Sequence, residues 1–153
     1  MIKRLALICA FFAQTAFAAE FVKNHDGDTI KISEAGQIVT IRLEYIDAPE
    51  LKQTMGKEAK EALYNLCSKA DITYTQSNKK SFNRVVSELY CNHTNVNQYL
   101  VKNGFAILDY RYAKGKTDYI ALESEAKQNR RGVWNIENMH TPKECRTDKK
   151  MCM

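Results

Sequence analysis

The stretch Ile41-Arg42-Leu43-Glu44-Tyr45-Ile46-Asp47-Ala48-Pro49-Glu50 places charged side chains in a short apolar run, and His25-Asp26-Gly27-Asp28-Thr29 does the same upstream. The carboxylates of Asp28, Asp47 and Glu50 are the hard oxygen ligands that suit a divalent cation. The planar guanidinium of Arg42 suits a phosphate group. This combination of residue types indicates metal-assisted cleavage of a phosphodiester bond.

Short strands are expected on both sides of these charged segments. Residues 21–23 and 30–32 flank Asp26-Gly27, which is typical of a strand, a turn and a strand. Residues 37–43 alternate, with Val39, Ile41 and Leu43 on one face, and the alternation ends before Pro49. The charged residues are therefore predicted to lie at strand ends.

Helical periodicity appears further along the chain. Apolar residues recur at intervals of three and four between residues 56 and 69, which predicts a helix. Asn95 or Thr94 is expected to cap a short helix that ends near Asn103. A second long helix is expected over residues 117–131, and strands over residues 72–75 and 84–91. Five short strands with three helices predict an α+β fold built on a small barrel of the oligonucleotide-binding type.

The two ends of the chain differ from its middle in composition. Residues 1–18 combine a basic start, a short apolar run and the A-x-A-like sequence Ala16-Phe17-Ala18, which predicts a secretory signal peptide. Its removal would lower the formal net charge of +5 by two and leave a mildly basic protein. We expect one domain over residues 20–134 and a solvated tail over residues 135–153, in a protein that is secreted or periplasmic and not held in a membrane.

Four cysteines remain after the predicted cleavage, at positions 67, 91, 145 and 152. An even number in an exported protein indicates two disulfides, with three pairings open. We favour Cys67–Cys91, which would join a helix end to a strand, and Cys145–Cys152, which would close a short loop in the tail. Zinc bound at Cys91-Asn92-His93 is the rival interpretation, but the chain has no C-x-x-C pair.

Ordinary structural roles also account for single members of the charged set. Asp26 precedes a glycine and fits a hairpin turn, and a lone aspartate is often a cap or a surface charge. Arg42 in a strand would be explained by pairing with Glu44 or Glu34 alone. The argument for a site therefore depends on the residues acting together.

The segments, taken in order, resemble the staphylococcal nuclease (thermonuclease) family over about residues 21–134. The two charged stretches carry the strongest match. The downstream pieces that follow in the same order are Gly56-Lys57-Glu58-Ala59, Phe82-Asn83-Arg84, Val96-Asn97, Gly104-Phe105-Ala106, Tyr110-Arg111-Tyr112, Glu125-Ala126 and Gly132-Val133-Trp134.

The resemblance implies a five-stranded oligonucleotide-binding (OB) barrel with three helices. It also implies a calcium-dependent endonuclease that cuts DNA and RNA, leaves 3′-phosphates and uses one calcium ion per site. Residue by residue, it matches Asp28 and Asp47 to the calcium-binding carboxylates, and Ala48 to a calcium ligand through its backbone carbonyl. We expect the protein to act as a monomer.

The resemblance assigns the remaining roles as well. Glu50 matches the general base, and Arg42 and Arg84 match two phosphate-binding arginines. Tyr110 and Tyr112 match tyrosines that line the nucleotide pocket, where an aromatic ring stacked on a base contributes about 1–3 kcal/mol.

Two departures from the family pattern affect these expectations. Phe82-Asn83 stands before Arg84 where the family has Tyr-Gly, and Asn83 is expected to take over the left-handed backbone geometry of that glycine. The tail after Trp134 has no counterpart in the pattern. The alternatives are an OB-fold module that binds nucleic acid with weak or no catalysis, and a structural or inhibitory secreted domain held by disulfides.

Overall fold

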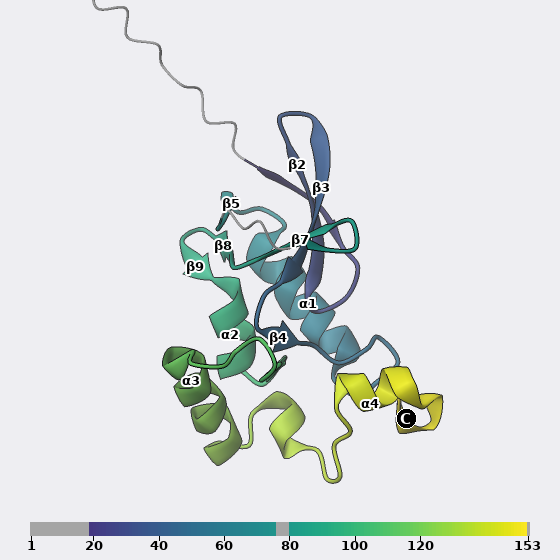
Figure 1. The fold of residues 1–153 in the computed structure, drawn as a ribbon. Coiled ribbons are helices and arrows are strands. Elements are labelled where there is room, and N and C mark those ends of the chain that lie inside the picture. The colour runs from purple at the N-terminus through teal and green to yellow at the C-terminus, as the bar shows by residue number, and fades with distance from the viewer. Residues whose placement is uncertain (1–18, 76–79, 153) are drawn as a thin grey trace, which may run out of the picture.

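The computed structural model describes residues 19–75 and 80–152, so the predicted signal peptide lies outside the described residues. The largest sheet has the strand order β1-β2-β3-β7-β6, in which β3 and β7 run parallel and the other neighbours antiparallel (Figure 1). Its strands are β1 (Glu20–Asn24), β2 (Thr29–Glu34), β3 (Gln37–Leu43), β6 (Lys80–Ser81) and β7 (Arg84–Ser87).

Two smaller sheets complete the strands of the described residues. One has the order β5-β8-β9, and the other pairs β10 with β4. Their members are β4 (Ile46–Asp47), β5 (Ile72–Tyr74), β8 (Leu89–Cys91), β9 (Thr94–Asn95) and β10 (Ile107–Leu108). The predicted strand over residues 84–91 is thus divided between two sheets, with Glu88 between β7 and β8. The fold is mixed α+β, as predicted.

The paired strands β2 and β3 bury one face in the core. Ile30 lies opposite Ile41 and Ile32 opposite Val39, and Ile30, Ile32 and Ile41 are fully buried. Each such side chain contributes about 1.5–3 kcal/mol relative to its exposure to water. Since a shift of one residue would turn these side chains to the solvent, their burial fixes the register that places Arg42 opposite Thr29.

Three helices occur where the sequence predicts them. They are α1 (Gly56–Cys67), α2 (Val96–Lys102) and α3 (Thr117–Gln128). The side chain of Asn95 accepts a hydrogen bond from the Gln98 backbone nitrogen and caps α2, as expected. The helix α3 ends three residues before the predicted boundary. Figure 1 shows α2 and α3 side by side on one side of the molecule.

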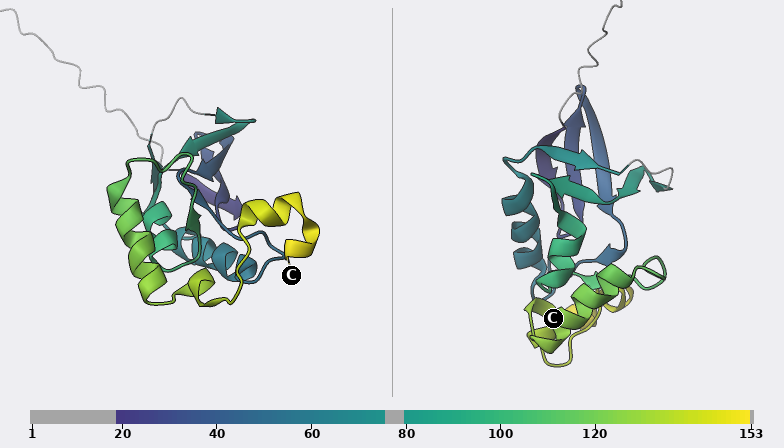
Figure 2. Two further views of the ribbon diagram at one scale, coloured as in Figure 1. Left: turned by 60° about the horizontal axis from the view of Figure 1, so that its bottom comes forward. Right: turned by 90° about the vertical axis from the view of Figure 1, so that its left-hand side faces the viewer.

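The segment after residue 135 differs from the solvated tail that we expected. It follows η1 (Gly132–Asn135) and contains α4 (Pro142–Thr147) and η2 (Lys149–Cys152), with Cys145 buried. A six-residue helix is too short to show periodicity, but Thr141 and Glu144 form a capping box with proline at the first helical position. In Figures 1 and 2 this segment lies at the end of the molecule opposite the tip of the β2–β3 hairpin.

Both favoured disulfide pairings are confirmed. Cys67 at the end of α1 is bonded to Cys91 in β8, with 5.3 Å between their Cα atoms. Cys145 is bonded to Cys152 across 4.7 Å between their Cα atoms. Because Cys91 is bonded to Cys67, it is not available as a zinc ligand, which removes the rival interpretation. No helix among the described residues has the length and apolarity needed to cross a membrane.

Candidate active site

A cleft of about 790 Å³ opens where the ends of β2 and β3 meet the β4–α1 loop, the β6–β7 turn and the segment after β10. Most of the residues singled out from the sequence line this one cleft. They are Asp28, Arg42, Asp47, Ala48, Glu50, Arg84 and Tyr112. Tyr110 is not part of the lining.

Asp28 is placed by the turn before β2. A side chain at Gly27 would lie only 2.7 Å from the Cβ of Ala59 and 2.8 Å from that of Ala48, so only glycine lets this turn pack so closely. The Asp28 carboxylate accepts hydrogen bonds from the Ala48 backbone nitrogen at 2.8 Å and from the Thr29 hydroxyl at 3.1 Å. Burial raises the pKa of Asp28 to about 7, although Arg42 opposes this shift.

Arg42 joins the two aspartates. Its Nη2 atom lies 3.1 Å from Oδ2 of Asp28 and 3.1 Å from Oδ1 of Asp47. Its Nη1 atom donates to the backbone carbonyls of Leu43 and Ile46. The two carboxylates therefore converge on one point at the floor of the cleft, and both aspartates are buried, with 5% of their surface exposed.

Glu50 lies on the loop between β4 and α1. A Cβ atom at Gly56 would lie 2.0 Å from the Glu50 carbonyl oxygen, so the loop closes against the helix start only because this residue is glycine. The Glu50 backbone nitrogen donates to the side chain of Gln53 at 2.8 Å. Its carboxylate is about one-third exposed and faces the cleft.

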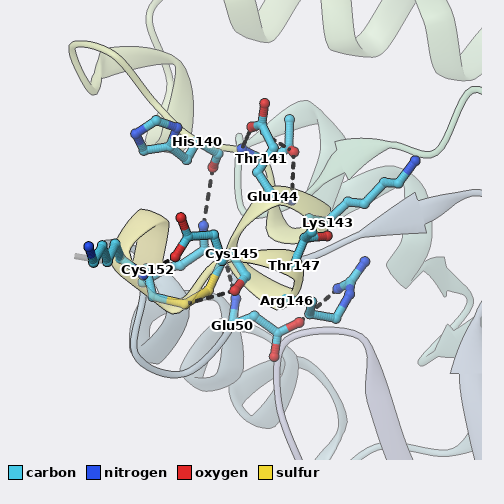
Figure 3. Close-up of a disulfide and its surroundings, with 12 residues drawn as sticks. Glu50, His140, Thr141, Lys143, Glu144, Cys145, Arg146, Thr147 and Cys152 are labelled. Carbon is cyan, nitrogen blue, oxygen red and sulfur yellow. Dashed lines mark hydrogen bonds and ion pairs between the residues drawn. A yellow bond between two sulfur atoms is a disulfide. The ribbon is translucent and has the colours of Figure 1, made fainter.

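Arg146 of α4 is a site residue that the sequence analysis missed. Its Nη1 atom lies 2.7 Å from Oε1 of Glu50 and 3.1 Å from Oδ1 of Asp47, and its Nη2 atom lies 2.8 Å from Oδ2 of Asp47. The hydrogen bonds to Asp47 are the main cause of a raised Arg146 pKa. Figure 3 shows the Arg146 side chain reaching Glu50 from beside the Cys145–Cys152 disulfide.

Arg84 lies in the same cleft but is held by a different partner. Its side chain donates to the carbonyl and hydroxyl oxygens of Ser81, and its guanidinium lies 5.9 Å from the ring centre of Phe82. Within the described residues, no hydrogen bond or ion pair joins Arg84 to Asp28, Asp47 or Glu50. The guanidinium is therefore not engaged by these acidic groups.

The turn before Arg84 differs from the expectation. Phe82, and not Asn83, has a positive φ, of 58°. The Phe82 ring is 91% exposed at the edge of the cleft. The expectation that Asn83 takes a left-handed backbone conformation is therefore wrong, because the turn places its left-handed residue one position earlier, at Phe82.

The two predicted pocket tyrosines lie in different surroundings. Tyr112 is well exposed in the cleft, and the guanidinium of Arg111 lies 5.4 Å from its ring centre. The Tyr110 hydroxyl donates to Glu123 at 2.6 Å, which raises the pKa of Tyr110 to about 12. The Tyr112 ring therefore lies where it can contact a nucleotide in the cleft, whereas the Tyr110 hydroxyl is hydrogen-bonded to α3.

The oxygen donors in the cleft fit a hard divalent cation in part. Asp28 and Asp47 supply two convergent carboxylates, and the described residues hold no group of three His, Cys, Asp or Glu side chains suited to a metal ion. Calcium and magnesium accept such sets, because water, backbone carbonyls and substrate oxygens complete their coordination. A softer metal such as zinc would find a single histidine, His25, and no cysteine among the residues that line the cleft.

The chain is similar in sequence to several known proteins. The profile of the family described as "Staphylococcal nuclease homologue" matches residues 40–136. An "Uncharacterized endonuclease" of Escherichia coli is 32% identical over 142 residues, which cover 88% of this chain and 91% of that protein. A "Micrococcal nuclease" of Shigella flexneri is 31% identical over 90% of this chain and 85% of that protein. A "Probable staphylococcal-like nuclease CAN3" of Oryza sativa subsp. japonica is 34% identical over 72% of this chain and 29% of that protein.

Proposed function

Because the chain belongs to the staphylococcal nuclease family, we propose that it is an exported, calcium-dependent endonuclease that hydrolyses phosphodiester bonds in DNA and RNA. The observation that carries this proposal is the convergence of Asp28 and Asp47 on the same nitrogen of Arg42, in a cleft that Glu50 and Arg84 also line. Acidic ligands for a cation and guanidinium groups for a phosphate are thereby held in one place.

In this proposal the metal site consists of Asp28, Asp47 and the backbone carbonyl of Ala48. One bound calcium ion would supply positive charge that neutralises the phosphate oxygens. Arg42 and Arg84 bind the nonbridging phosphate oxygens, for which the fork of a guanidinium is suited. To do so, Arg42 gives up its Nη2 contacts with Asp28 and Asp47 to the cation. Removing one such donor typically lowers the rate by about 10² to 10³.

Glu50 is the proposed general base. Its partly exposed carboxylate accepts a proton from a water molecule, and the water oxygen forms the new bond to phosphorus. The bond to the 5′ oxygen breaks, that oxygen takes up a proton from solvent water, Glu50 returns its proton to solvent, and the phosphate stays on the 3′ side. Tyr112 stacks on a base next to the cut. Tyr110 positions Tyr112, because its hydrogen bond to Glu123 holds the segment that carries both tyrosines.

The proposed OB barrel goes beyond the three sheets described above. Two observations support it. β8 follows β7 after the single residue Glu88, so the strand continues from the large sheet into the β5 sheet. An isolated bridge between Ala19 and Ile72 joins the start of the large sheet to β5. A ring of strands of this kind presents its cleft to nucleic acid.

Export is supported by the two disulfides, which persist in oxidising compartments. The proposed location is the periplasm or the medium, after removal of residues 1–18 as a signal peptide. The proposed working form is a monomer.

A second candidate function is a nucleic-acid-binding module with weak or no catalysis. The contact of Arg146 with both Asp47 and Glu50 favours it, because these carboxylates are already paired with a positive charge. Such a module would bind an oligonucleotide without shortening it.

The test is cleavage of a fluorescently labelled single-stranded DNA by residues 19–153, with calcium or with a chelator. We expect cleavage that requires calcium and that Glu50→Gln slows by about 10² to 10⁴. Glu58→Gln is the matched control, since Glu58 is exposed on α1 outside the cleft lining. Equal cleavage with calcium and with chelator would contradict the metal role, and binding without cleavage would favour the second candidate.

A further inference from the structure

The contact between α4 and the cleft has no role in the chemistry proposed above. Arg146 reaches both oxygens of Asp47 and one oxygen of Glu50, all within 3.1 Å. Together with Arg42, it leaves neither oxygen of Asp47 without a guanidinium partner. Arg146, a side chain of the C-terminal segment, thus makes two hydrogen bonds to Asp47, whereas Arg42 makes one.

The segment that carries Arg146 is fixed in several ways. Its helix begins with a capping box between Thr141 and Glu144, and Cys145, next to Arg146, is buried and bonded to Cys152. The backbone carbonyl of His140 accepts a hydrogen bond from Gln53, on the same loop as Glu50 (Figure 3). The disulfide-closed segment is therefore docked on the Glu50 loop at two points, and Arg146 is delivered to a defined position.

A divalent cation and Arg146 compete for the same carboxylate oxygens, because Oδ1 of Asp47 already accepts from both Arg42 and Arg146 and Oδ2 accepts from Arg146. A cation ligated by Asp47 takes at least one of the carboxylate oxygens that now accept from Arg146. The two positive charges would also repel each other at such short range. Binding of one therefore opposes binding of the other, and the opposition is reciprocal.

We propose that Arg146 is a tethered counter-cation that occupies Asp47 and Glu50 in the metal-free protein, and that a divalent cation must displace it to bind. This inference rests on the proposed function, since it concerns the same carboxylates. Displacement frees Glu50 to act as a base and undocks α4 from the cleft. At low calcium concentrations Arg146 stays in place and the protein is inactive. When calcium is abundant it displaces Arg146 and the protein becomes active.

The first experiment is a calorimetric titration of residues 19–153 with calcium chloride, without substrate. Arg146→Gln removes the competing charge and should lower the calcium Kd by about five- to tenfold, at the low end of the range for coupled sites. Lys143→Gln is the matched control, because Lys143 lies on the same helix and extends away from Glu50 in Figure 3. We expect its calcium Kd to stay within about twofold of the unmodified protein, as for a screened surface charge.

The outcomes separate this inference from the proposed function. An unchanged or higher calcium Kd in Arg146→Gln overturns the inference and leaves the proposed metal site standing. An equal decrease in both variants overturns it too, because a general charge effect would then explain the result. If neither the unmodified protein nor Arg146→Gln binds calcium, both the metal site and the competition are refuted.

A second variant and a second readout do not depend on removing the arginine. The pair Cys145→Ser and Cys152→Ser keeps Arg146 but opens its tether, and it should also lower the calcium Kd. In the unmodified protein, amide hydrogen exchange over residues 143–148 should become faster when calcium saturates the site. Exchange that is unchanged or slower would mean that α4 stays docked, which would contradict displacement.

Discussion

Replacement of Arg42 by methionine tests whether this guanidinium holds the floor of the cleft. Methionine keeps much of the apolar stem and removes every donor. The arginine makes two ion pairs, with Asp28 and Asp47, and donates to two backbone carbonyls. Its loss would leave the buried Asp28 carboxylate without a guanidinium partner, and Asp47 close to it would be paired with Arg146 alone.

The size of the effect follows from these contacts. A hydrogen bond to a charged group contributes about 1.5–3 kcal/mol, and breaking a buried ion pair on one side costs about 3–5 kcal/mol. The Arg42 side chain is 18% exposed, which places the loss at the lower end. We expect Arg42→Met to lower the free energy of unfolding by about 3 kcal/mol in the absence of divalent ions.

The assay is urea unfolding at pH 8 with a chelator, followed by far-UV circular dichroism. Burial raises the pKa of Asp28 to about 7, and pH 8 lies above this value, so Asp28 is mostly ionised in the assay. Arg131→Met is the control, because Arg131 forms a more exposed pair with Glu125 that is worth at most about 1 kcal/mol. If the two variants lose the same small amount, the guanidinium of Arg42 does not hold buried carboxylates together and the reasoning fails.

Three further predictions concern single roles. Glu50→Gln should lower kcat on single-stranded DNA by about 10² to 10⁴ with KM changed only a few-fold, as expected for a lost general base, and an unchanged kcat would rule out that role. Replacing Cys67 and Cys91 together by serine should lower the free energy of unfolding by about 3 kcal/mol, from the loop closed across a separation of 24 residues, and a loss below about 1 kcal/mol would contradict a stabilising bridge. Tyr112→Ala should raise KM for single-stranded DNA about fivefold or more, whereas Tyr110→Phe should leave KM within about twofold, and equal effects on KM would contradict the different surroundings of the two rings.

The parts of the fold that follow from periodicity could be predicted from the sequence. The alternation around Ile41 and the spacing of apolar residues in α1 determine which faces are buried, so these elements follow from residue types alone. The cap at Asn95 follows from its side chain in the same way. Cys67 and Cys91 lie at the ends of such elements, which is why their pairing could also be predicted.

The parts that were missed depend on contacts between distant segments. Arg146 lies 96 residues from Glu50 in the chain, and nothing in the residues around it indicates an acidic partner. The capping box at Thr141 could have shown that this segment is helical, but not where the helix docks. The left-handed residue at Phe82 depends on how the β6–β7 turn closes, and residue preferences alone favoured its neighbour Asn83.

The most direct measurement of the central claim is a crystal structure of residues 19–153 with calcium and a short phosphorothioate oligonucleotide. We expect one calcium ion bound by carboxylate oxygens of both Asp28 and Asp47, with a backbone phosphate held between Arg42 and Arg84. A calcium ion bound elsewhere, or an oligonucleotide that lies outside this cleft, would contradict the account.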